Sequence, residues 1–173
     1  MNNAAASEVR LRSLRSGDEE SAVRWGADEA FCRAVDWPPG LSAAHLRAHW
    51  QDLIAATEPD FLRLGIERGG RLVGYTDLAH ITDHGAEFGI AIGERTLWGS
   101  GVGTAAGQQT LTHAFGPLGL RRVHAEVHLP NLRSHALMRR LGFRELGRAG
   151  AQEYQGQIVP VVRYRLDRVD FTP

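Results

Sequence analysis

A run of closely spaced glycines constrains the fold of this chain more than any other feature of its sequence. In the stretch "AEFGIAIGERTLWGSGVGTAAGQQ", residues 86–109, the glycines separate a strand-like segment from residues that favour a helix. The first N–H groups of a helix lack internal partners and carry the positive end of its dipole, so they attract anions. Missing side chains at Gly99, Gly101 and Gly103 would let a phosphate reach them. The alternative is a tight turn that binds nothing.

Two familiar phosphate-binding motifs do not account for these glycines. A P-loop requires a lysine that this stretch does not contain. The dinucleotide-binding fingerprint fails at Thr104 and Ala106, and the preceding strand is not the first of a βαβ series. The glycine run therefore indicates an anion site of another kind.

The remaining patterns predict strands and helices that alternate along the chain. Period-two alternation predicts strands at 9–15, 86–93, 121–129, 143–148 and 158–166, and a hairpin at 61–81 with its turn at Gly69-Gly70. Four helix starts are expected: near Ser16, at Ser42, directly after the glycines and at Asn131. The first is indicated by the capping-box spacing of Ser16 and Glu19. The order predicts a mixed α/β fold with helices threaded through a central sheet.

Length and composition narrow the class of protein. The chain has 173 residues, which fits a single domain spanning residues 1–173. Its formal net charge is zero, so no global basic field favours nucleic acid. Cys32 is the only cysteine, which excludes an intramolecular disulfide and favours a reducing compartment. The N-terminal stretch lacks an export-signal pattern and no apolar run is long enough for a membrane helix, so we expect a cytoplasmic protein without membrane contact.

Two sequence blocks together resemble a known family. "IGERTLWGSGVGT" and, after a helix and a strand, "NLRSHALMRRLGF" are similar to the GNAT N-acetyltransferases, most of all to the ribosomal-protein N-terminal (alanine/serine) acetyltransferase branch. The family's cofactor loop is Q/R-x-x-G-x-G/A, which residues 98–103 fill with Trp98 in place of Gln or Arg, a version common in that branch. The second block retains Asn131, Ser134 and the Leu-Gly-Phe at 141–143. The resemblance covers nearly the whole chain.

The resemblance implies the GNAT fold and acetyl-CoA as co-substrate, with no metal. In that fold a mixed, mostly antiparallel sheet carries helices on both faces, and two central strands splay apart around the cofactor. The residues that the resemblance assigns to the cofactor are Ile90, Ile92, Trp98, Gly99, Ser100, Gly101, Val102, Gly103, Thr104 and Asn131. The first two would pair with pantetheine as an added strand does, and the loop would hold the pyrophosphate.

The chemistry needs an acid for the departing thiolate, and the resemblance places a tyrosine in the helix after Asn131 for this role. The aligned position is Met138, which cannot donate a proton. Ser134, one turn into the same helix, is the substitute we expect, with water as the alternative. Ser134 is also a residue type that is ordinary near helix starts.

The general base has several candidates. Glu87, which precedes the cofactor strand, is the first choice, and Glu126, His128 and water are the others. His124, Glu126 and His128 alternate along one strand and share one face. That face has three interpretations: the wall of a substrate pocket, a metal site, or an ordinary polar sheet face.

These observations favour an acetyl-CoA-dependent N-acetyltransferase that acts on a primary amine. The acceptor would be a protein N-terminus or a small molecule, and a homodimer is compatible with the sequence. The alternative is a non-catalytic acyl-CoA-binding protein on the same fold, which Met138 supports. A third hypothesis is metal-assisted hydrolysis at His124, Glu126 and His128. Trp37 lies in a loop that would either contact the acceptor or fill the core.

Overall fold

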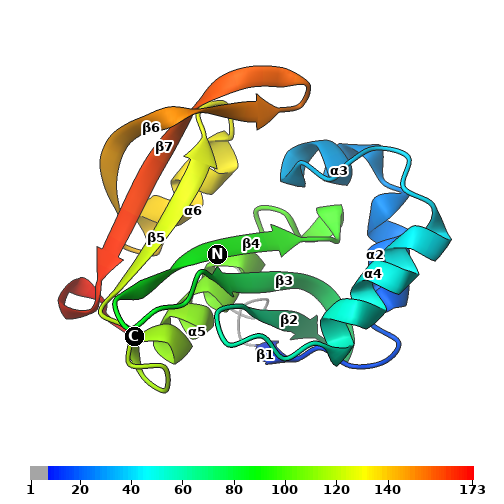
Figure 1. Cartoon of the computed structure of the whole chain (residues 1–173), viewed down its shortest axis with the longest axis horizontal. Coiled ribbons are helices and arrows are strands. Elements are labelled where there is room, and N and C mark those ends of the chain that lie inside the picture. The colour runs from blue at the N-terminus through cyan, green and yellow to red at the C-terminus, as the bar shows by residue number, and fades with distance from the viewer. Residues whose placement is uncertain (1–7) are drawn as a thin grey trace.

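The computed structural model describes residues 8–173, which form one seven-stranded sheet with five α-helices (Figure 1). Residues 1–7, part of the stretch examined for an export signal, lie outside it. The elements are β1 (Val9–Ser13), α2 (Glu19–Gly26), α3 (Glu29–Val35), α4 (Ala43–Ala55), β2 (Leu62–Arg68), β3 (Arg71–Ala79), β4 (Gly85–Ile92), α5 (Val102–Phe115), β5 (Arg122–His128), α6 (Leu132–Arg140), β6 (Arg144–Tyr154) and β7 (Gln157–Asp167). Short 3-10 helices occupy Arg95–Leu97 and Arg168–Asp170.

The strand order is β1-β2-β3-β4-β5-β7-β6, and neighbouring strands are antiparallel except β4 and β5. These two parallel strands pair only over Gly85–Glu87 and Arg122–His124. β4 then continues to Ile92 and β5 to His128 without pairing further with each other. Figure 1 shows the two halves of the sheet diverging at this point. The predicted splay of two central strands is confirmed.

Helices cover both faces of the sheet, as predicted. On one face, apolar residues of α5 and α6 pack on β5, whose Val123, Ala125 and Val127 are buried. On the other face, α2, α3 and α4 enclose an aromatic cluster that includes Trp25 and Tyr75. Because side chains alternate along a strand, the burial of the apolar set turns the polar residues of β5 towards the second face.

Several turns and caps follow directly from local sequence. Gly69 and Gly70 have φ of 57° and 76°, as the two-residue turn of the predicted hairpin requires. Ser42 accepts the backbone N–H of His45 at the start of α4. Gly142, with φ 86°, ends α6 in the left-handed conformation that glycine adopts without strain.

The early helical region differs from the prediction. The expected capping box is wrong, because α2 begins at Glu19 with Asp18 at its N-cap, and the Glu19 carboxylate accepts the N–H of Gly17. One expected helix is also two helices, since Asp28 caps a new helix through the N–H groups of Ala30 and Phe31.

None of the helices within residues 8–173 combines the length and apolarity that a bilayer crossing requires.

Candidate active site

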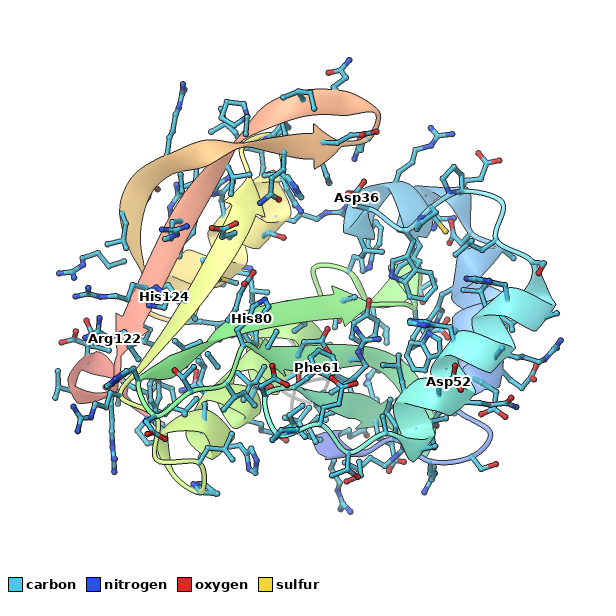
Figure 2. All side chains as sticks on the ribbon, viewed as in Figure 1. Asp36, Asp52, Phe61, His80, Arg122 and His124 are labelled. Atoms are coloured by element: carbon cyan, nitrogen blue, oxygen red, sulfur yellow. The ribbon has the colours of Figure 1, made fainter. Side chains whose placement is uncertain are left out.

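A cleft of about 650 Å³ opens where β4 and β5 diverge. Its walls come from β3, β4, β5, the glycine loop, the start of α5, one side of α6, the end of α3 and Tyr154 of β6. Figure 2 shows Asp36 at the end of α3, beside the open end of the gap, while His124 and Arg122 lie towards the end where the strands pair. The cleft therefore lies between the two strands of the sheet that share the shortest stretch of pairing, β4 and β5.

The glycine loop forms the end of the cleft that α5 closes. Gly99 and Gly101 have φ of 77° and 91°, a region that L side chains rarely adopt. Gly101 is the N-cap of α5 and provides no side-chain cap. The first N–H groups of α5 are therefore left for another partner. Gly103 is different, because a Cβ there would lie 3.8 Å from Leu137 and 3.9 Å from Ile92, which is ordinary contact.

Trp98 joins this loop to β4. Its Nε1 donates a 2.8 Å hydrogen bond to the carbonyl oxygen of Ile92. The Arg133 guanidinium lies 3.8 Å from the centre of the indole ring, in cation–π contact. The strand edge beyond Trp98 remains open: Gly93 donates to Val73 of β3, and backbone groups alternate along a strand, so those of Ile90 point towards the gap.

Most of the residues expected at the cofactor line this cleft. They are Ile90, Ile92, Trp98, Gly99, Gly101, Gly103, Thr104 and Asn131. Two others do not line it. Val102 is fully buried in the core beside α5, and the Ser100 hydroxyl donates to the carbonyl oxygen of Leu97 at 2.6 Å. A side chain at either position supports the loop rather than the cleft surface.

α6 brings the expected acid into the same cleft. Asn131 caps the helix, its Oδ1 accepting the N–H of Ser134 at 3.2 Å, which confirms the predicted cap. Ser134 and Met138 both line the cleft. The N–H of Asn131 donates to the carbonyl oxygen of His128 at 2.8 Å, so a single turn links the end of β5 to the start of α6.

The three candidate bases are separated by the structure. Glu126 and His128 line the cleft, but Glu87 does not. Glu87 lines a second hollow of about 410 Å³ together with His124 and with Glu126, which borders both spaces. Glu87, the first choice for the general base, therefore lies outside the cleft that contains Ser134. Its position is at the end of the seam where β4 and β5 still pair, opposite His124.

Two of these polar residues have well-defined surroundings. The Glu126 carboxylate accepts hydrogen bonds from Arg163 at 2.8 Å and Gln152 at 3.0 Å. In His124, Nδ1 is buried with no partner among residues 8–173. Burial, followed by the charge of nearby Arg122, lowers the pKa of His124. Within that same part of the chain, no three His, Cys, Asp or Glu residues are grouped to hold a metal ion.

The cleft also contains residues of β3 that the sequence did not single out. Tyr75 of β3 is buried there, and burial raises its pKa. Trp37, expected either at the acceptor or in the core, packs in the aromatic cluster and donates to the Tyr75 hydroxyl at 3.1 Å. Asp77 is held by Arg63 through two 2.7 Å hydrogen bonds. These residues come from distant segments, and no local spacing connects them.

Tyr154 lines the cleft from the β6–β7 hairpin. It is the last residue of β6, and Gln155 and Gly156 follow it with positive φ of 54° and 76°, the turn of the β6–β7 hairpin. Its hydroxyl donates to the carbonyl oxygen of Ala34 on α3 at 3.3 Å. The hairpin and α3 therefore meet over the cleft.

Comparison with known proteins agrees with this geometry. The acetyltransferase (GNAT) domain family matches residues 8–144. Mycobacterium smegmatis RimJ, solved with CoA-disulfide, is 25% identical, with a TM-score of 0.82 over 92% of this chain and 81% of that one. Spermidine N-acetyltransferase from Vibrio cholerae, solved with CoA and spermine, is 22% identical, with a TM-score of 0.81 over 95% and 98%.

A GNAT-family acetyltransferase from Bacillus anthracis is 17% identical, with a TM-score of 0.81 over 94% and 96%. The last two likenesses, at such low identity, concern the fold. No curated protein matches the sequence. The family match extends over more than half of the chain and includes the glycine loop, the splayed strands and the start of α6, so the chain belongs to the GNAT acetyltransferases.

Proposed function

We propose that this protein is an acetyl-CoA-dependent N-acetyltransferase that transfers an acetyl group to a primary amine by direct attack on the thioester. One observation carries the proposal: the uncapped start of α5 and the open edge of β4 line the same cleft. A pyrophosphate needs the first of these features and an extended pantetheine arm needs the second. Family membership supports the same chemistry.

The cofactor would lie along the cleft with its phosphates at the glycine loop. The N–H groups at the start of α5 would bind the pyrophosphate, with Arg133 as the nearby positive charge. Pantetheine would pair with the backbone of Ile90. The Ile92 carbonyl oxygen already accepts a hydrogen bond from Trp98. We therefore propose that Ile92 contacts pantetheine only through its N–H and its side chain. Ser100 and Val102 shape the loop.

The transfer needs no nucleophile from the protein. The amine nitrogen forms a bond to the acetyl carbonyl carbon, the carbon–sulfur bond breaks, and CoA leaves as a thiol. The Ser134 hydroxyl would donate a hydrogen bond to the departing sulfur. A thiol has a reference pKa of about 8.5 and leaves readily, so this contribution assists the reaction without being indispensable. Of the base candidates that the sequence indicated, Glu126 and His128 are the two that line the cleft.

The acceptor is a protein N-terminus or a small-molecule amine. The likeness to RimJ supports the ribosomal-protein N-terminal acetyltransferase branch, which the sequence motifs also favour. Spermidine N-acetyltransferase shares the fold, so a polyamine is the alternative acceptor to be tested. A non-catalytic acyl-CoA-binding protein is the second candidate, because Met138 stands in the cleft where a proton-donating tyrosine was expected.

The experiment that tests the proposal has two stages. In the first, melting temperature is measured with and without acetyl-CoA; at about a hundred times the dissociation constant, the ligand should stabilise the fold by roughly 2.7 kcal/mol. In the second, thiol release is followed with an alanyl peptide, a seryl peptide and spermidine as acceptors. Absence of a thermal shift would refute cofactor binding. A shift without amine-dependent thiol release would establish the binding protein.

A further inference from the structure

Resting on the proposed function, we infer that His128 is the general base and that Tyr154 is the residue that positions it. The two aromatic rings are stacked, with centroids 4.4 Å apart and planes inclined by 15°. Both residues line the cleft. Neither ring nitrogen of His128 makes a hydrogen bond with any residue in 8–173. Both nitrogens are accessible from the surface. The imidazole is thus held by its face while its nitrogens remain available.

The other cleft candidate is less suited to this role. The Glu126 carboxylate is engaged at both oxygens, by Arg163 and by Gln152. Taking a proton would require it to give up part of an ion pair that is already formed. His128 has no such competitor, and the strand alternation that buries Val127 directs His128 to the same face as Glu126.

Tyr154 reaches His128 because the β6–β7 hairpin turns immediately after it. The tyrosine ring is buried, and its hydroxyl donates a hydrogen bond to the Ala34 carbonyl oxygen. The ring on which His128 stacks is therefore held both by the β6–β7 hairpin and by α3. His128 is fixed at its own backbone, because its carbonyl oxygen accepts the N–H of Asn131. The same turn leads into α6, so the base is the last residue of β5 and Ser134, the acid, lies in the helix that follows.

The proton balance follows from the acceptor's ionisation. An acceptor ammonium gives one proton to an imidazole nitrogen of His128, and the free amine attacks the thioester. The second proton leaves the nitrogen as the carbon–sulfur bond breaks and ends on CoA as its thiol. His128 then releases its proton to solvent. An α-ammonium, with a reference pKa of about 7.7–8.0, gives up its proton near neutral pH to a positioned base.

The charged and titratable groups that face His128 are few. Glu126 and Arg163 form an ion pair and largely cancel. Tyr154 faces it from β6, and Asp36 lines the cleft from the exposed end of α3. A side chain that must be neutral to accept a proton stops acting as a base once it is protonated, so a base of this kind produces an acid limb in the pH profile.

The test is the pH dependence of kcat/KM for thiol release from acetyl-CoA, with alanyl peptide or spermidine as the acceptor probe. His128→Gln should lower kcat/KM about a hundredfold near pH 7.5, the lower end of general-base contributions, and abolish the acid limb. Its acetyl-CoA affinity should be unchanged by titration calorimetry. His128→Ala should regain rate when free imidazole is added. His49→Gln, at an exposed histidine of α4, is the control and should match the wild type.

Tyr154 is tested by two matched variants. Tyr154→Phe keeps the stacked ring and loses only the hydrogen bond to Ala34, so kcat should fall less than in Tyr154→Leu. Tyr154→Leu loses the ring, so kcat should fall at least tenfold, while acetyl-CoA affinity is retained. A wild-type acid limb in His128→Gln, or its loss in Glu126→Gln alone, would overturn the inference. If the wild type itself neither binds acetyl-CoA nor releases thiol, the proposed function fails instead.

Discussion

Gly103 offers the sharpest separation of cofactor binding from folding. It is the second residue of α5, it lines the cleft, and its φ is not in the positive region. A Cβ there would meet only the ends of the Leu137 and Ile92 side chains, at 3.8–3.9 Å. Gly103→Ala should therefore fold well and gain about 0.5–1 kcal/mol from the lost backbone entropy. The family's loop accepts either glycine or alanine here, so the affinity for acetyl-CoA should be nearly unchanged.

Gly103→Val places branched methyl groups where the pyrophosphate must approach. Valine is better than glycine in a helix by only a few tenths of a kcal/mol, so the free energy of unfolding should change little. The affinity for acetyl-CoA should fall at least about tenfold, or 1.4 kcal/mol. Calorimetric titration with acetyl-CoA and thermal melting without ligand measure the two effects separately. For a chain of this size, 1 kcal/mol corresponds to roughly 2–4 °C.

The alanine variant serves as the control for the valine variant. Equal acetyl-CoA affinity in both would refute the reasoning and make the glycine run a turn without a ligand. Gly101→Val is a poorer test, because φ at Gly101 is 91° and any side chain there strains the backbone. A loss of binding in that variant would not distinguish a blocked site from a distorted loop.

Three further predictions concern the acid, the pH dependence of stability and metal content. Ser134→Ala should lower kcat by about tenfold or more with acetyl-CoA affinity retained, and a loss of affinity at unchanged kcat would instead make Ser134 a binding residue. Because the folded protein lowers the pKa of His124, the unfolded chain binds this proton more readily, so stability should fall as pH drops below about 6.5. His124→Gln should flatten that part of a plot of melting temperature against pH, and an unchanged slope would contradict the assignment. Purified protein should contain no stoichiometric metal by elemental analysis and should keep its activity in chelator; one zinc per chain, lost in His124→Ala, would support the hydrolase hypothesis.

Local chemistry determined the parts of this protein that depend on neighbouring residues. The glycine pair at 69–70 has the conformational freedom that its turn requires, and Asn131 and Ser42 cap helices because their side chains reach N–H groups three residues on. The alternation of apolar and polar residues along β5 predicted which of its faces is buried, the one with Val123, Ala125 and Val127. The motifs of the glycine loop and α6 were enough to identify the family and, with it, the splay of β4 and β5.

The rest depended on contacts between segments far apart in the chain, which no spacing encodes. Glu87 was the first choice for the base in sequence, yet it pairs opposite His124 where β4 and β5 are still joined and does not line the cleft. Tyr154 and Ala34 are 120 residues apart and meet only because the hairpin folds over α3. The tertiary structure alone decides which titratable side chains face the cleft, since that depends on where two strands stop pairing.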